Sequence, residues 1–586
     1  MINGNLTRMI FPLTVFIPFA GALLALASPR LGRLHSAWVA GGVALLALAA
    51  LLPYVSAPFG GETLVWELPW IPSVGLSLAF RLDGLSLIFA LLVLGIGLLI
   101  ILYARYYLPP KDCMGRFYAY LLLFMGSMLG IVLSENLIQL VVFWEMTSLS
   151  SFLLISYWRE KEESRKGALM ALTVTGAGGL ALLGGVLILG HIVGSYQLTD
   201  VLAAGDLIRL DPLYTVALVL ILLGAFTKSA QFPFHFWLPR AMAAPTPVSA
   251  YLHSATMVKA GVFLLARLFP ALSDTPEWSW LVGGAGLVTF LMGAYIALFK
   301  HDLKGLLAYS TISHLGLITV LLGIGTPLAG VAAVFHVLNH AVFKASLFMA
   351  AGIIDHEAGS RDMRVLSGLW RYMPYTGLLA AVAAAAMAGV PLANGFLSKE
   401  MFFAEAVGAT TKLEFGWLLP VVVTVAGALA VAYSVRFIHD VFFGPEAVDL
   451  PRQPHEPPRW MRVPVEILVL LCLVVGILPA LTVGPILSVA AAGLLQAPPP
   501  HYDLALWHGF SPALWMSVMA LTGGVAIYAL RYQLFVLHTR IQMRPDAETM
   551  FDAVVSAIIR LASALTRWMD RGSLRSGPVS TDTFGS

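Results

Sequence analysis

Apolar residues recur along this chain in runs of about 20 residues, the length that an α-helix needs to cross the hydrocarbon of a bilayer. Short polar segments separate these runs. The pattern predicts an all-α polytopic membrane protein with about fifteen transmembrane helices. We expect the helices at 9–28, 36–53, 81–104, 117–134, 136–158, 167–194, 213–238, 242–269, 278–299, 304–323, 327–351, 374–408, 416–438, 463–483 and 511–530.

Basic residues gather in alternate loops, which predicts the direction of each helix. Lys and Arg cluster after the odd-numbered runs, whereas the loops at 54–76, 199–212 and 270–277 are poor in them or richer in acids. Because cytoplasmic loops are enriched in Lys and Arg, we expect the N-terminus outside and the C-terminus in the cytoplasm, in the inner (plasma) membrane. The clusters are Arg30/Arg33, Arg105/Lys111/Arg116, Arg159/Lys161/Arg165/Lys166, Lys300/Lys304, Arg361/Arg364/Arg371, Arg452/Arg459/Arg462 and Arg531/Arg540.

The helices group into two units. Five runs at 117–269 and five at 278–438 begin on opposite sides of the membrane, so the units are expected to be inverted repeats. Residues 1–116 would supply three further helices, and 439–586 the C-terminal helices and a cytoplasmic tail. Pro233 and Pro391 should break the fourth helix of each unit, because proline removes a backbone donor. Broken helices in corresponding positions of two halves point to a transport site.

Composition supports the membrane class and excludes several chemistries. Hydrophobic residues make up 59% and charged residues 11% of the chain, and the mean hydropathy is +0.84. The two cysteines, Cys113 and Cys472, are too few to ligate an iron–sulfur cluster or a structural zinc ion. No dinucleotide-binding, P-loop or hydrolase motif occurs. We therefore expect no cofactor, no metal, no redox or hydrolytic chemistry in this chain and no nucleic acid partner.

Charged side chains inside the apolar runs are the candidate functional residues. A charge at the centre of a bilayer costs about 2.5–3.5 kcal/mol on insertion scales, so partners, water or proton loss must compensate it. Lys228 and Glu145 both lie well inside apolar runs. We interpret them as a switch in which protonation of Glu145 releases Lys228 to pass on its own proton. A static buried ion pair that fixes helix register is the alternative.

A second set of titratable residues lies on one predicted helix. His336, His340 and Lys344 recur at i, i+4 and i+8, so they share one face at levels about 6 Å apart. Histidine titrates near neutral pH, which makes a proton relay plausible. Satisfied core histidines or a metal site are the alternatives, although no carboxylate or cysteine at suitable spacing favours zinc.

Two lysines would extend this series in both directions. Lys259 is expected to link the Lys228 region with the second unit, and Lys399, with Glu400 and Glu405, to form the outward end of the pathway. Lys304 is either part of the path or a snorkelling lysine at a helix end. Solvated or capping roles are expected for a set of residues at loop edges, namely Glu135, Asp355, His356, Glu357 and Arg361.

Long motifs carry a resemblance to a known family. The segments at 227–239, 244–261, 336–344, 352–357 and 394–400 resemble the antiporter-like subunits shared by respiratory complex I and Mrp-type cation/proton antiporters. Residues 354–357 and 507–510 are most similar to the large A subunit of Mrp antiporters. The resemblance implies that Glu145 and Lys228 pair, that Lys259 connects inward, that His336, His340 and Lys344 form the central relay and that Lys399 is the terminal lysine. It also implies membrane subunits as partners.

The resemblance leaves the function open between three hypotheses. The first is a proton-conducting subunit of a multisubunit sodium/proton antiporter, which would exchange H⁺ and Na⁺. The second is a proton-pumping subunit of a quinone oxidoreductase or membrane-bound hydrogenase. The third is a subunit of an inorganic-carbon uptake complex with a zinc-bearing partner. The chain lacks the long lateral helix of complex I subunits and the further spans of a full-length Mrp A subunit, so a shorter or split form of that large subunit is expected.

Overall fold

The computed structural model describes residues 11–27, 33–411, 416–447, 450–541 and 547–570 of the chain. Arg30 and the polar tail at 577–586, both used above, lie outside the described residues. The chain divides into two compact units, residues 1–532 and 533–586. The first unit contains all the candidate site residues.

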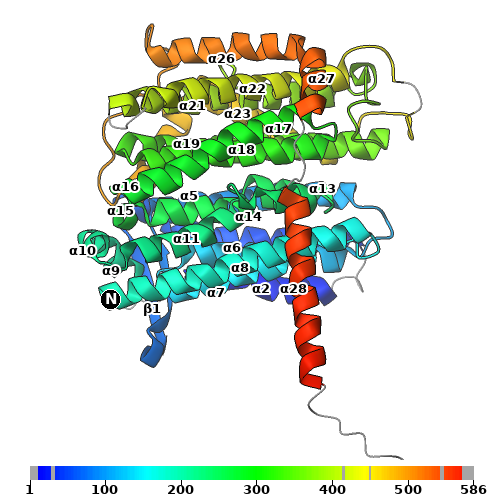
Figure 1. Ribbon diagram of the computed structural model, residues 1–586. Helices are drawn as coiled ribbons and strands as arrows, with labels where there is room; N and C mark the ends of the chain where they lie inside the picture. Colours follow the sequence, from blue (N-terminus) through cyan, green and yellow to red (C-terminus); the bar gives the residue numbers. More distant parts are fainter. Residues whose placement is uncertain (1–10, 28–32, 412–415, 448–449, 542–546, 571–586) are drawn as a thin grey trace, which may run out of the picture. The chain divides into compact units, whose positions relative to one another are not determined.

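In the described part of the first unit, 12 helical segments are long and apolar enough to cross a membrane, and they run side by side in Figure 1. They confirm a mainly helical polytopic membrane protein. The segments are Ser36–Phe59, Gly84–Tyr107, Met114–Leu133, Leu137–Ile155, Glu162–Val193, Thr246–Arg267, Pro276–Phe299, Leu303–Ile324, Pro327–Ala358, Leu418–Phe442, Arg459–Ile477 and Pro512–Ala529.

The first half of this unit is built around the long helix α8 (Glu162–Val193), which packs between α7 (Leu137–Ile155) and α11 (Tyr214–Lys228). Gly178 and Gly185 of α8 allow close approach to α11, because a Cβ at either position would overlap Thr227 or Ile221. The other elements here are α2 (Leu13–Ala27), α3 (Arg33–Leu51), α4 (Ser56–Phe59), α5 (Gly84–Tyr107), α6 (Met114–Leu133), α9 (Leu198–Ala203) and α10 (Gly205–Leu210).

The second half is organised around α19 (Pro327–Ala358), which contacts α18 (Leu303–Ile324), α20 (Pro374–Ala388) and α21 (Asn394–Gly408). Helix α22 (Leu418–Phe442) packs against α26 (Pro512–Ala529) and α17 (Gly284–Phe299). The remaining helices are α12 (Trp237–Ala241), α13 (Thr246–Ser254), α14 (Met257–Arg267), α15 (Phe269–Leu272), α16 (Pro276–Trp278), α23 (Arg459–Ile477), α24 (Pro479–Thr482) and α25 (Gly484–Leu495). Helix α25 was not expected from the sequence.

Polar side chains fix where several of these helices begin. Asp83 accepts a hydrogen bond from Ser86 N at 2.9 Å before α5, and Asn136 accepts from Ile138 N and Gln139 N before α7. Asp302 and Thr326 cap α18 and α19 in the same way. Such caps satisfy backbone N–H groups that the first turn leaves without partners.

Both predicted helix breaks are present. Three of the fifteen expected spans contain no single helix long enough to cross a membrane, and the breaks are the reason for two of these. Helix α11 ends at Lys228, and the chain resumes as a helical turn at Phe234–Phe236 that leads into α12. Trp237 Nε1 donates to the carbonyl of Thr227 at 2.8 Å, which satisfies a backbone group freed by the break. Helix α20 ends at Ala388, and α21 starts at Asn394.

A third break was not expected. The run at 242–269 divides into α13 and α14 at Ala255 and Thr256. Ser229, just past the end of α11, donates its Oγ to Val258 O at 2.6 Å and accepts from Val262 N at 3.0 Å. The broken ends of α11 and α14 are therefore locked together by one serine.

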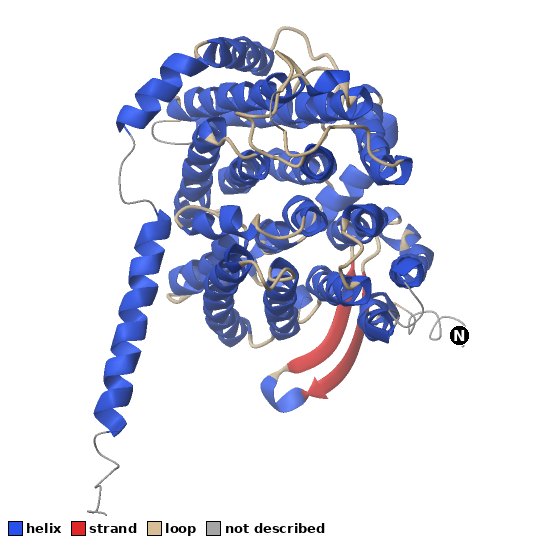
Figure 2. Ribbon diagram, turned by 90° about the vertical axis from the view of Figure 1, so that its right-hand side faces the viewer, coloured by secondary structure: helices blue, strands red, loops and turns tan. Residues whose placement is uncertain are grey.

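The all-α expectation is wrong at one place, where the predicted loop at 54–76 and the start of the next span form a hairpin. Strand β1 (Leu64–Ile71) pairs antiparallel with β2 (Leu76–Leu82), and Figure 2 shows both strands in red at the edge of the helices. The side chains of β2 near Leu82 are buried, whereas most of β1 is exposed. Pro69 lies within β1, where the register shifts, and proline in a run argues against a strand, so the segment carries no strong strand pattern.

The second unit is described by itself. It holds most of α27 (Arg531–Ile541) and α28 (Ala547–Asp570). Helix α28 is continuous over its 24 residues.

Candidate functional site

Lys228 lies at the end of α11 with its side chain fully buried. Its Nζ donates to Ser148 Oγ at 2.8 Å and to Trp144 O at 3.1 Å, both on α7. The ammonium group also lies 5.3 Å from the centroid of the Trp144 ring, within the range of a cation–π contact. Three neutral groups of α7 thus surround the buried charge.

Glu145 follows Trp144 in α7, and its carboxylate lies against α8. The nearest partners of that carboxylate are the glycines of α8, where a Cβ on Gly176 would lie 3.8 Å from Oε2. Within the part of the chain that the structure describes, Oε1 has no hydrogen-bond partner and no ion pair joins Glu145 to Lys228. The structure thus places Lys228 beside the turn of α7 that carries Glu145, without a salt bridge between the two side chains.

Lys259 connects the two halves. It lies in the first turn of α14, fully buried, and its Nζ donates to Val337 O of α19 at 2.6 Å. Val337 follows His336 directly in the sequence. The lysine that was expected to link inward therefore contacts the helix that carries the predicted relay.

The histidines of α19 belong to a larger cluster than the sequence indicated. The rings of His336 and His340 lie 6.4 Å apart along α19, and His314 of α18 fits beside both. His314 Nδ1 is 2.9 Å from His336 Nε2, and Tyr433 OH of α22 is 3.3 Å from His314 Nε2. Sequence reasoning missed His314, although a histidine inside the neighbouring apolar run was a visible signal.

The hydrogen bonds of this cluster form an ordered series. His336 Nδ1 is 2.9 Å from Ser398 Oγ of α21, the residue before Lys399. A neutral imidazole has one donor and one acceptor nitrogen. If Tyr433 donates to His314, then His314 donates to His336 and His336 donates to Ser398, so all four groups point one way. Such a series can pass a proton along its length.

His340 and Lys344 occupy the next two turns of α19. Both ring nitrogens of His340 are buried without a hydrogen-bond partner among the described residues. Lys344 Nζ contacts Ser310 Oγ of α18 and Met387 Sδ of α20, the latter at 3.3 Å. No group of three or more His, Cys, Asp or Glu side chains in the described ranges could hold a metal ion.

Lys399 lies at the second helix break. Its Nζ donates to Met387 O at 2.8 Å and to Ala388 O at 2.9 Å, the last carbonyls of α20. A helix leaves these carbonyls without intrahelical partners, and its C-terminus carries a partial negative charge. The break therefore supplies the polar groups that compensate the buried ammonium group.

Three charged residues that the sequence placed at loop edges or helix ends are buried instead. One of them, Glu357, is 4% exposed, and its Oε2 lies 3.2 Å from His455 Nε2. Lys304 is 2% exposed, and its Nζ donates to Ala244 O at 2.7 Å, so it does not extend to the membrane surface. Glu135 is also 2% exposed, which corrects the expectation of a solvated residue. Its partners come from strand β2 and helix α9, so the sequence alone could not show them.

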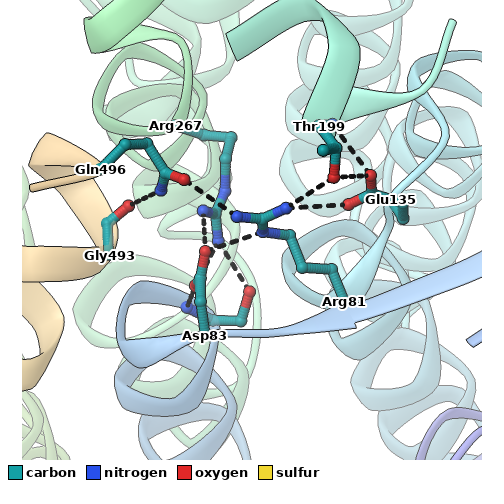
Figure 3. Close-up of polar contacts among 8 residues, drawn as sticks. Arg81, Asp83, Glu135, Thr199, Arg267, Gly493 and Gln496 are labelled. Carbon is teal, nitrogen blue, oxygen red and sulfur yellow. Dashed lines mark hydrogen bonds and ion pairs between the residues drawn. The ribbon is translucent and has the colours of Figure 1, made fainter. Parts of the chain in front are cut away.

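Glu135 belongs to a network of buried charges at one end of the helices (Figure 3). Glu135 Oε2 pairs with Arg81 Nη1 at 3.3 Å, and Oε1 accepts from Thr199 Oγ1 at 2.5 Å. Asp83 pairs with Arg81 at 2.9 Å and with Arg267 at 2.5 Å. The network ties the hairpin to α5, α7, α9 and α14.

Two arginines stabilise the charged form of Asp83. Burial alone would raise the pKa of the Asp83 carboxyl, but the guanidinium groups of Arg267 and Arg81 outweigh burial and hold that pKa well below its usual range. Arg81 also donates to Gln496 Oε1 at 3.0 Å, which adds the end of α25 to the assembly. The network thus contains equal numbers of basic and acidic side chains, two arginines and two carboxylates.

Comparison with known families identifies the class of protein. The family model described as NADH:quinone oxidoreductase/Mrp antiporter, TM, matches residues 134–426, and the model of the N-terminus of complex I chain 5 matches residues 69–118. These ranges include all seven candidate residues and much of the network around Asp83.

Individual relatives narrow the class. The chain is 57% identical to the A/B subunit of a probable K⁺/H⁺ antiporter of Rhizobium meliloti over 95% of its own length and 56% of that protein. It is 42% identical to the A subunit of the Na⁺/H⁺ antiporter of Alkalihalophilus pseudofirmus over 93% of its length and 71% of that protein. It belongs to the NADH:quinone oxidoreductase/Mrp antiporter family and, within it, to the group of Mrp-type A subunits.

Solved structures agree with this assignment. The Mrp complex of Dietzia sp. DQ12-45-1b contains a chain that is 35% identical, with a TM-score of 0.84 over 97% of this chain and 61% of that one. An archaeal membrane-bound sulfane sulfur reductase shares the fold, with a TM-score of 0.73 at 24% identity over 83% of this chain and 98% of that one. The chain thus spans a little over half the length of the Rhizobium and Dietzia proteins.

Proposed function

We propose that this chain is the proton-translocating membrane subunit of a multisubunit monovalent cation/proton antiporter, and that it conducts protons along the partly buried Glu145 and the buried residues Lys228, Lys259, His336, His340, Lys344 and Lys399. Other membrane subunits would be its partners. The relatives are named as Na⁺/H⁺ and K⁺/H⁺ antiporter subunits, so the exchanged cation is Na⁺ or K⁺.

One observation carries the proposal. Residues adjacent to the candidate lysines are hydrogen-bonded in series across the protein: Ser229 to Val258, Lys259 to Val337, and His336 to Ser398. These contacts join the end of α11 and the first turns of α14 and α21 to the interior of α19, from the residue after Lys228 to the residue before Lys399. The contacts hold these helix segments together, so the candidate lysines and histidines lie in one row between the two helix breaks, which supports a proton path along them.

The energy scale is compatible with a membrane potential as a driving force. Moving one elementary charge through 100 mV is worth about 2.3 kcal/mol, close to the roughly 2.5–3.5 kcal/mol that one charge costs at the bilayer centre. A change in the protonation of Glu145 or Lys228 can therefore be coupled to an ion gradient.

The arrangement of helices follows from the same proposal. We infer fifteen spans, with α2, the α11 region and the α20 region added to the 12 long segments. The units at 117–269 and 278–438 would be inverted repeats, flanked by 1–116 and 439–586, and the N-terminus would lie outside. The breaks at Lys228 and at Gly389–Ala393, in the fourth helix of each unit, support this inference.

The first test removes the proposed switch. Lys228→Ala and Glu145→Gln should each abolish Na⁺- or K⁺-driven collapse of a pH gradient in everted vesicles that contain the full complex, because each variant lacks one titrating group. Blue native electrophoresis should show normal assembly. Full exchange in both variants would remove these residues from the mechanism.

The second test addresses the relay. His340→Ala should lower the rate of exchange by roughly 10²–10⁴-fold, the usual contribution of a positioned proton-transfer group. His356→Ala provides the matched control, because His356 lies on the same helix but is partly exposed near its end. Equal rates in the two variants would leave the histidine relay without support.

A further inference from the structure

A notch on helix α8 receives the carboxylate of Glu145. The notch is formed where α8 lacks side chains at Gly176 and Gly179. A Cβ on Gly179 would overlap Oε1 of Glu145 and lie 2.8 Å from its Cδ. The observed position of the carboxylate therefore requires glycine at 179.

Gly179 differs in this respect from its neighbours. Gly178 and Gly185 face Thr227 and Ile221 of α11, so they serve the close packing of two helices. Opposite Gly179 lie the carboxylate and, at 3.2 Å from an added Cβ, the Cδ1 atom of Trp144. An added Cβ would be only slightly too close to Trp144 but would overlap Glu145, so Glu145 is the side chain that occupies the space beside Gly179.

The notch keeps the two members of the proposed switch apart. Lys228 is bound to Trp144 O and Ser148 Oγ of α7, while Oε1 of Glu145 has no hydrogen-bond partner among the described residues. A buried oxygen of an ionised carboxylate is costly without a hydrogen-bond partner, whereas that of a protonated carboxyl group is far less so. The geometry suits a neutral Glu145 held away from the lysine.

We propose that Gly179 is a positioning residue, which provides a resting place for the protonated Glu145 side chain. In the exchange cycle the side chain leaves the notch when it loses its proton, and the carboxylate then swings to the ammonium group of Lys228. This inference rests on the proposed function, because it assigns a step to the Glu145 switch.

The variant Gly179→Ala tests the notch directly. The added methyl group displaces the carboxylate, and we expect exchange to fall on the order of 100-fold, as when a reacting group is misplaced by about 1 Å. Gly184→Ala on the same helix is the matched control, because Gly184 does not contact Glu145 and its Cβ would meet only Leu220 Cδ1, at 3.4 Å. It should exchange at the wild-type rate. Equal losses in both variants would show a general packing defect and overturn the proposal.

Infrared difference spectroscopy of the purified complex provides a readout that does not depend on transport. The carboxylic C=O band that disappears in Glu145→Gln reports the neutral side chain, and Gly179→Ala should shift or abolish it. An unchanged band in Gly179→Ala would overturn the proposal even if exchange were reduced.

Two further outcomes are distinguishable. If Gly179→Ala prevents assembly, Gly176→Val replaces it, because its side chain narrows the notch from the other end. This variant should reduce both the carboxylic band and the rate of exchange. Wild-type values for both would overturn the proposal. If Glu145→Gln exchanges normally, the proposed function fails, whereas the band in Gly179→Ala still decides whether the notch holds a neutral carboxyl group.

Discussion

Single residues show how the protein accommodates charges inside the membrane. Lys228, Lys259 and Lys399 each donate to main-chain carbonyls, and those that receive Lys399 lie at the end of a broken helix. Carbonyls freed by a break are tolerated in a membrane only where the protein satisfies them. Lys399 and the freed carbonyls of Met387 and Ala388 thus satisfy each other, whereas Lys228 and Lys259 donate to carbonyls inside the unbroken helices α7 and α19.

The network around Asp83 makes a prediction about stability. Asp83→Asn would leave Arg267 and Arg81 buried without their shared carboxylate, and the loss of one partner from a buried ion pair costs about 3–5 kcal/mol. The thermal unfolding midpoint of the purified complex should fall clearly. Asp362→Asn, which breaks the exposed pair with Arg364, should leave the midpoint nearly unchanged. Similar midpoints for both variants would show that the Asp83 network contributes little.

The sequence predicted the buried lysines better than their surroundings. Lys228, Lys259 and Lys399 stood out because ammonium groups are rare in apolar runs. His314 and Glu135 were missed or misplaced, since their partners, His336 and Arg81, come from other helices or from a strand. The notch at Gly179 was equally invisible, because a glycine that packs two helices and one that accommodates a carboxylate look alike in sequence.

At the scale of elements, the ends of two helices show how a glycine can affect both the backbone and a candidate lysine. Gly389 ends α20 with φ of +86°, and an added Cβ there would lie 2.8 Å from Cδ of Lys399. Gly194 ends α8 in the same left-handed conformation, with φ of +79° and nothing within 4 Å of an added Cβ. The two glycines share their backbone role and differ only in contact with the lysine.

Because only Gly389 contacts Lys399, the same substitution at the two glycines separates the effect on stability from the effect on exchange. Gly194→Ala and Gly389→Ala should each lower stability by about 1 kcal/mol, because alanine is unfavourable at positive φ. Only Gly389→Ala should also reduce exchange, since its methyl group would push Lys399 away from the last carbonyls of α20. Rates in everted vesicles and unfolding midpoints measured on the same preparations separate the two effects. Equal exchange in both variants would show that the position of Lys399 is not critical.

For the whole molecule, hydropathy located the long spans well and the irregular segments poorly. The 12 long helical segments all fall on predicted runs, because a stretch of apolar residues in a bilayer must satisfy its own backbone. The hairpin β1–β2, helix α25 and the break between α13 and α14 were not expected. Each depends on contacts with distant parts of the chain, such as Ser229 with Val258, that no local pattern encodes.

The two cysteines allow the proposed orientation to be tested with the natural chain. Cys113 is exposed in the loop between α5 and α6, and Cys472 is fully buried in α23. If the N-terminus lies outside, the Cys113 loop faces the cytoplasm. A membrane-impermeant maleimide should then label the chain in everted vesicles but not in intact cells, and Cys113→Ser should abolish the labelling because Cys472 is inaccessible. If intact cells are labelled and Cys113→Ser abolishes that labelling, the proposed orientation of every helix is wrong. Lys399 would then not lie at the outward end of the pathway.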